Sequence, residues 1–177
     1  NFILNAVNEG ASFYEALRQA MEKGFTEPDP RLDLFGVDVK RKTVILAREA
    51  GYEIEQEGVE MEDYLPQACL NADTIDDFLE NVKSHDQEIR QQWEKPLQQG
   101  HKLRFVASFS EGKARLTIEG FDSEHPFYQL KDTDNMVLLH SRWYHPHPLV
   151  IKGAGAGARV TASGVLKNVF EIVQQKK

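Results

Sequence analysis

The segment Glu27-Pro-Asp-Pro-Arg-Leu-Asp-Leu-Phe-Gly-Val-Asp-Val-Lys-Arg-Lys42 places four carboxylates and four cationic side chains around two prolines and one glycine. Each proline fixes its own φ angle and keeps the residue before it out of helical space, so Glu27 and Asp29 are expected to be extended. Beyond them, a helix is predicted from about residue 33 to residue 50, followed by Gly51. The segment is therefore too stiff and too highly charged for an ordinary linker.

The predicted helix carries Asp38 and Lys42 four residues apart, on one of its faces. Its other residues are apolar on nearly every side, which predicts a helix packed all round with the charged pair in the interior: Val37, Val39, Val44, Ile45, Leu46 and Ala47. The alternative is an ordinary helix-stabilising pair on a solvated face. Together with Glu27 and Asp33, the pair forms a candidate site for holding a cationic amine and moving a proton. Spacing alone leaves both interpretations open.

Residues 24–42 resemble the homoserine dehydrogenase family, whose pattern reads Gly-Tyr-Thr-Glu-Pro-Asp-Pro-Arg-x-Asp-Leu-x-Gly-x-Asp-Val-x-Arg-Lys. The similarity extends to residues 1–5 and 153–165, and so spans essentially the whole chain. Leu65-Pro66 and residues 144–149 look most like the forms that are fused behind an aspartate kinase. The chain departs from the pattern at Phe25, where tyrosine is usual, and at Phe35 and Lys40, where small or polar residues are common.

The resemblance implies roles for the four charged residues. The lysine that matches Lys42 is the general acid/base, and the residues that match Glu27 and Asp38 bind the amino acid substrate. The carboxylate that matches Asp33 lies in the same site and helps to place substrate and lysine. The replacement of tyrosine by Phe25 removes a hydroxyl that could have bonded the substrate.

The reaction implied by the resemblance is the reduction of L-aspartate 4-semialdehyde to L-homoserine with NADPH or NADH, in threonine, methionine and isoleucine synthesis. The nucleotide is expected to be bound mainly by an upstream Rossmann domain that is missing here, so the isolated chain is expected to be inactive. Gly155 and Gly157 are candidates for backbone contact with NADP or NAD. From the residues alone, this glycine run is a tight strand-to-helix turn or an anion cradle. A non-catalytic amino-acid-binding or assembly module is the alternative function.

The order of elements predicts an α+β fold, with a mostly antiparallel or mixed sheet covered by helices on one face. Helices are predicted from a capping box at Ser12 and Glu15, in the motif, and from Thr74 to about Lys95 before Pro96. Strands are predicted at 103–109, 114–118, 136–144 and 149–152, with a turn at Glu111-Gly112. Residues 1–152 are expected to form the catalytic and dimerisation domain. Residues 153–177 are expected to be a turn and a helix that return to the missing domain.

Composition limits the function classes and the partners. A net charge of −7 argues against a nucleic-acid partner or an anionic membrane surface. The chain has neither a membrane-length apolar run nor a signal peptide, and its single cysteine, Cys69, fits a cytoplasmic location as an inert loop thiol. Two of the three clustered histidines, His145 and His147, flank one proline near His140. This arrangement is weak evidence for a zinc site, so no metal is expected.

A homodimer is expected if the second face of the sheet is apolar. Because the chain starts within an apolar segment without methionine, it is expected to come from a longer polypeptide.

Overall fold

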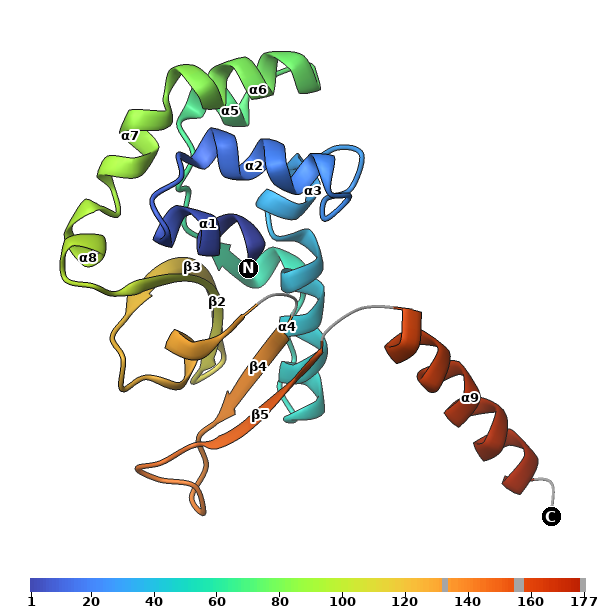
Figure 1. The fold of residues 1–177 in the computed structure, drawn as a ribbon. Coiled ribbons are helices and arrows are strands. Elements are labelled where there is room, and N and C mark those ends of the chain that lie inside the picture. The colour runs from blue at the N-terminus through green and yellow to red at the C-terminus, as the bar shows by residue number, and fades with distance from the viewer. Residues whose placement is uncertain (132–133, 155–157, 176–177) are drawn as a thin grey trace. The chain divides into compact units, whose positions relative to one another are not determined.

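The computed structural model describes residues 1–131, 134–154 and 158–175, which fall into two compact units, Asn1–Tyr128 and Gln129–Lys177 (Figure 1). Each unit is described by itself. Helices come first and most strands follow, so the predicted α+β class is confirmed. The division at residue 152 that the sequence suggested stays a prediction.

The first unit opens with helices that stack around an aromatic centre. The helices are α1 (Phe2–Asn8), α2 (Phe13–Glu22), α3 (Arg31–Leu34), α4 (Val37–Glu49), α5 (Gln67–Leu70), α6 (Ile75–Ser84), α7 (Asp86–Gln91) and α8 (Glu94–Gln98), with short 3₁₀ turns at Gln56–Gly58 and Pro126–Gln129. The capping box at the start of α2 is confirmed. The Ser12 hydroxyl accepts a bond from the Glu15 amide at 3.1 Å, and the Glu15 carboxylate accepts one from the Ser12 amide at 3.3 Å.

A mixed sheet completes this unit, in the order β1 (Val59–Met61), β3 (Lys113–Phe121), β2 (Lys102–Ser110). β2 and β3 are antiparallel, with Phe105 opposite Ile118, while β1 runs parallel to β3. The predicted turn between β2 and β3 forms at Glu111 and Gly112, whose φ angles of 51° and 79° are those of a tight hairpin turn. β1 was not predicted, because three residues are too few to show a period.

Two apolar clusters fill the space between helices and sheet. The larger one is built by the N-terminal helices, α6, α7 and Leu103 of β2, around Phe13, Phe78 and Trp93. The smaller one packs Val44 and Ala47 of α4 onto Ala114 and Leu116 of β3. All of these side chains lie on one face of the sheet, so the expectation that helices cover one face holds.

The opposite face of β2 and β3 is mainly polar. It presents Lys102, Arg104, Ser108, Arg115 and Thr117. Arg104 is buried, and its guanidinium donates to Asn5 Oδ1 at 2.8 Å and to the carbonyl oxygens of Phe127 and Tyr128 at 2.7 and 2.8 Å. These bonds tie α1, the edge strand β2 and the 3₁₀ turn together, which is how a charged side chain is accommodated inside the fold.

The prediction of one continuous helix from Thr74 to about Lys95 is wrong. The chain bends at His85 and again at Trp93, which divides the segment into α6, α7 and α8. Pro96 does not end a helix but lies in the first turn of α8. A proline is tolerated there because its missing N–H would have had no partner within the helix.

The second unit consists of an antiparallel hairpin, β4 (Asp134–Leu139) and β5 (Leu149–Ala154), and the helix α9 (Ala158–Gln175). The strand predicted at 136–144 therefore ends early. Residues 140–148 form the connection between β4 and β5, where prolines and turns replace the ladder. None of the helices in the described ranges is both long and apolar enough to cross a membrane.

Candidate active site

Gly36 decides where the helix of the charged segment begins. Its φ angle is +64°, in the left-handed region, and it separates α3 from α4. A β-carbon at this position would lie 2.9 Å from side-chain atoms of both Leu116 and Phe105. The predicted start of the helix at Asp33 is therefore wrong, because a left-handed glycine packed tightly on the sheet interrupts the helical backbone there.

Arg31 and Asp29 fasten the proline-rich loop before α3. The Arg31 guanidinium donates to both oxygens of Asp29 at 2.7–3.1 Å and to the Ala72 carbonyl oxygen at 2.8 Å. These hydrogen bonds from Arg31 hold the pKa of the Asp29 carboxyl below its usual range. Pro30, between them, is fully buried. The loop is therefore anchored to the body of the unit at two points.

Asp33 acts on the backbone of the same loop. Its Oδ2 accepts a hydrogen bond of 2.7 Å from the Glu27 amide, six residues earlier in the chain. The Glu27 side chain itself is exposed. Asp33 thus fixes the place from which the Glu27 carboxylate extends.

Lys42 and Asp38 form a pair on the surface of α4. Lys42 Nζ lies 2.6 Å from Asp38 Oδ2, and their side chains are 55% and 69% exposed. The expectation of an interior pair is therefore wrong. The helix buries only a stripe formed by Thr43, Val44 and Ala47, and leaves Ile45 and Leu46 more than half exposed. A run of four apolar residues had suggested burial on all sides.

The two halves of the candidate site keep separate contacts. Asp33 is joined to Glu27, and Asp38 to Lys42, with no hydrogen bond or ion pair between the halves in the described residues. An ammonium group and carboxylates that are open to solvent can receive a charged small molecule. The ammonium can stabilise a developing negative oxygen, and the carboxylates can bind a cationic amine.

The described residues contain no dinucleotide-binding βαβ unit. Their parallel strands β1 and β3 are linked through four helices and β2, and not through the single crossover helix of a nucleotide-binding βαβ unit. Gly155 and Gly157, the predicted nucleotide contacts, lie outside the described residues. Within the described ranges, no group of three or more histidine, cysteine or acidic side chains is placed to hold a metal ion.

The sequence reasoning missed the residues that position the charged groups. Arg31 and Gly36 were read only as parts of a motif, although Pro30 and the left-handed preference of glycine could have indicated an anchored turn. Cys69 is buried in the short helix α5 and not in a loop. Its burial, together with nearby Glu88, raises the pKa of the thiol, as expected for an unreactive cysteine.

Comparison with known proteins gives this geometry a context. A family model described as homoserine dehydrogenase matches residues 1–170. The bifunctional aspartokinase/homoserine dehydrogenase of Haemophilus influenzae is 41% identical over 174 residues, which cover 98% of this chain and 21% of that protein. The bifunctional aspartokinase/homoserine dehydrogenase 2 of Escherichia coli is 44% identical over 163 residues, covering 92% of this chain and 20% of that protein.

A solved structure shows the same fold. A Candida auris protein of unknown function is 36% identical and superposes with a TM-score of 0.87, covering 98% of this chain and 50% of that one. The chain thus spans about a fifth of the bifunctional relatives and half of the solved structure.

Proposed function

We propose, from the premise that the chain belongs to the homoserine dehydrogenase family, that it supplies the substrate-binding and catalytic residues for the reduction of L-aspartate 4-semialdehyde to L-homoserine. The family consists of NAD(P)-dependent oxidoreductases that act on small molecules. In this proposal the reaction serves threonine, methionine and isoleucine biosynthesis. The observation that carries it is the Lys42–Asp38 pair, which is held at 2.6 Å and yet remains open to solvent.

Lys42 is the proposed general acid. Reduction of an aldehyde leaves negative charge on the former carbonyl oxygen, and an ammonium beside that oxygen can stabilise the charge and donate its proton. Asp38, four residues earlier on α4, accepts from the same ammonium and so directs it. In the reverse direction, the neutral amine of Lys42 would take the proton of the homoserine hydroxyl.

Glu27 and Asp38 are the proposed partners of the substrate ammonium. Both carboxylates are exposed and carry negative charge, as a cationic amine requires. Asp33 contributes by holding the Glu27 backbone through its 2.7 Å hydrogen bond, and so places one carboxylate relative to Lys42. A well-placed ammonium brings the aldehyde of a four-carbon substrate to a fixed point, which is the main requirement for directed proton transfer.

The nucleotide, NADP or NAD, would be bound mainly by residues outside the described part of this chain. Gly155 and Gly157 remain the proposed backbone contacts within it. We expect the isolated 177-residue chain to bind NADPH weakly and to turn over little homoserine, since the bifunctional relatives are about five times longer.

The proposal also covers the whole protein. We expect it to be cytoplasmic, to be fused to an aspartate kinase, and to assemble as a homodimer or a higher homo-oligomer. The names of the two bifunctional relatives support the fusion. The opposite face of the sheet is mainly polar, so it does not supply the apolar interface that was the condition for the predicted homodimer. In the described residues the outer edge of β2 has no partner strand beyond Leu103, whose N–H and carbonyl bond the Asn8 side chain, and such an edge can pair with its copy across a two-fold axis. Sedimentation that finds only monomers at micromolar concentration would contradict the assembly.

The test of the function uses the full-length polypeptide that contains this chain. Homoserine-dependent reduction of NADP or NAD is expected. Glu27→Gln and Asp38→Asn should each raise the KM for homoserine by about tenfold or more and also lower kcat, because each removes a charge-assisted contact to the ammonium. Glu22→Gln, which changes an exposed carboxylate on α2, is the matched control and should leave both constants unchanged.

The outcome separates two functions. Binding of homoserine without any turnover in the full-length polypeptide would instead favour a non-catalytic amino-acid-binding module. Unchanged KM values in both acidic variants would contradict the substrate-binding roles even if turnover were present.

A further inference from the structure

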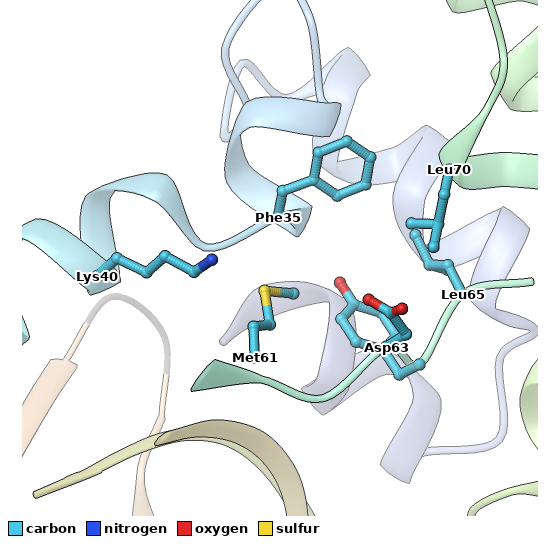
Figure 2. A pocket seen from close by; sticks show the side chains of 7 residues that line it. Phe35, Lys40, Met61, Asp63, Leu65 and Leu70 are labelled. Atoms are coloured by element: carbon cyan, nitrogen blue, oxygen red, sulfur yellow. The ribbon is translucent and has the colours of Figure 1, made fainter. Parts of the chain in front are cut away.

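We propose that a cavity beside α4, distinct from the candidate active site, binds a small zwitterion with an apolar body, of the size and charge of a hydrophobic α-amino acid. The cavity has a volume of about 290 Å³ and lies between α4, β1 and the segment that follows β1 (Figure 2). This volume is at the lower end for ligand sites, so it suits an amino acid and is too small for a nucleotide. The inference does not depend on the proposed dehydrogenase function.

The cavity lies on the other side of α4 from the catalytic pair. Lys40 lines it, and Lys40 is two residues from Asp38 and two from Lys42. At about 100° per residue, its side chain leaves the helix about 200° from each of them. None of the four candidate active-site residues lines the cavity. A ligand here would therefore contact α4 without occupying the place of the substrate.

Apolar side chains form part of the cavity wall, beside the polar surface of Lys40 and Asp63. Phe35, Met61, Leu65 and Leu70 contribute hydrocarbon and thioether surface. Tyr64 also lines it, but its hydroxyl donates to the Leu34 carbonyl oxygen at 2.8 Å, so the ring is locked as a wall. The same ring packs edge-on against Phe13 and Phe105 of the core. Such a surface favours a branched aliphatic group.

Two opposite charges face each other across the cavity. Figure 2 shows the Lys40 ammonium entering from α4 on one side and the Asp63 carboxylate on the other. In the described residues, neither side chain forms a hydrogen bond or an ion pair, with the other or with a third group. A zwitterion complements this arrangement, with its carboxylate at Lys40 and its ammonium at Asp63.

The binding test uses three probes and one reporter. The probes are L-leucine, 4-methylpentanoate, which lacks the ammonium, and 3-methylbutylamine, which lacks the carboxylate. The reporter is the Met61 methyl resonance of polypeptide labelled with ¹³C at its methionine methyls, assigned with Met61→Leu. Met21 and Met136 do not line the cavity and serve as internal controls.

Leucine should shift the Met61 resonance saturably at millimolar concentration and bind about fivefold more tightly than either truncated probe. Lys40→Met should weaken the binding of leucine and 4-methylpentanoate but not that of 3-methylbutylamine. Asp63→Asn changes an exposed side chain and does not threaten folding. It should weaken the binding of leucine and 3-methylbutylamine but not that of 4-methylpentanoate.

Several results would overturn the proposal. An unmoved Met61 resonance at millimolar leucine would show that the cavity takes no such ligand. Equal responses to all three probes would show that Lys40 and Asp63 do not discriminate between ligands by their charged groups. Lys40→Met should also leave kcat within about twofold of the unaltered enzyme, since its side chain is not placed in the catalytic site. A variant that lost turnover but still bound leucine normally would place Lys40 in the catalytic site instead.

Discussion

Residues 27–34 and helix α4 carry neighbouring parts of one charged segment, but they are held in different ways. The first part is fastened by Arg31 to Asp29 and Ala72, and by Asp33 to the Glu27 backbone. In the second part, Asp38 and Lys42 form an ion pair with each other on an exposed helix surface, and within the described ranges neither side chain has another hydrogen bond or ion pair. A group that binds a ground-state charge gains from a rigid support, whereas a group that moves a proton needs access to the reacting atom. The difference thus matches the roles proposed for Glu27 in substrate binding and for Lys42 in proton transfer, whereas Asp38 takes part in both.

The largest expected effect comes from breaking the joint between the two parts. Gly36→Ala should destabilise the fold by about 2–5 kcal/mol, from left-handed strain and from a β-carbon that would lie 2.9 Å from Leu116 and Phe105. Gly51→Ala is the matched control, because Gly51 also has a positive φ but has nothing within 4 Å of the added carbon. It should cost about 1–2 kcal/mol. Urea unfolding measures both, and equal losses would mean that close packing at Gly36 contributes nothing.

A second change loosens only the first part. Arg31→Met removes the bonds to Asp29 and Ala72, and should lower the melting temperature and raise the KM for homoserine more than it lowers kcat. Arg18→Met removes an exposed pair with Glu22 at 3.4 Å and should cost less than about 1 kcal/mol. Thermal melts and steady-state kinetics give the comparison. An Arg31→Met variant with an unchanged melting temperature and an unchanged KM would show that the anchor does not support the site.

A third test measures how the melting temperature depends on pH. The pKa of Asp29 is lowered in the fold by Arg31, so its carboxylate contributes stability above its ordinary pKa of about 4, and that contribution is lost as the pH falls through the lowered pKa. Asp29→Asn should therefore make the decline of melting temperature below about pH 4 less steep. Arg31→Met should flatten the same part of the curve. If the melting temperature of either variant fell with pH as steeply as that of the unaltered protein, the lowered pKa of Asp29 would not contribute to stability.

The smallest expected effect concerns the stability supplied by the second part. Lys42→Met breaks a pair whose partners are 55% and 69% exposed, so it should change the free energy of unfolding by less than about 1 kcal/mol. A loss of several kcal/mol would show that Lys42 is a structural residue, and it would remove the contrast between the two parts.

Local signals in the sequence predicted what local forces decide. The capping box at Ser12 and Glu15 and the turn at Glu111-Gly112 form as predicted, because each depends on residues a few positions apart. The alternation in β2 likewise predicted the strand. For the charged segment, the four candidate residues were found from the pattern alone, and the structure places each of them at or near the surface of one unit.

Tertiary context decided the rest. Gly36 is left-handed because β2 and β3 approach it closely, which no window of sequence can show. β1 is only three residues long and exists because it pairs with β3, more than fifty residues later. The exposure of Asp38 and Lys42 was misjudged because an apolar run on α4 lies partly outside the stripe that packs on the sheet. Arg104 shows no sequence signal for its three distant partners.

The central claim is that Lys42 supplies the proton at the reacting oxygen, and one measurement addresses it directly. In the full-length enzyme, kcat for homoserine oxidation should fall by about 100-fold or more in Lys42→Met, because the loss falls on the transition state. Lys40→Met, on the opposite side of the same helix, is the matched control and should stay within about twofold. Both variants should melt like the unaltered enzyme. A Lys42→Met enzyme that melts normally and keeps a near-normal kcat would contradict the account.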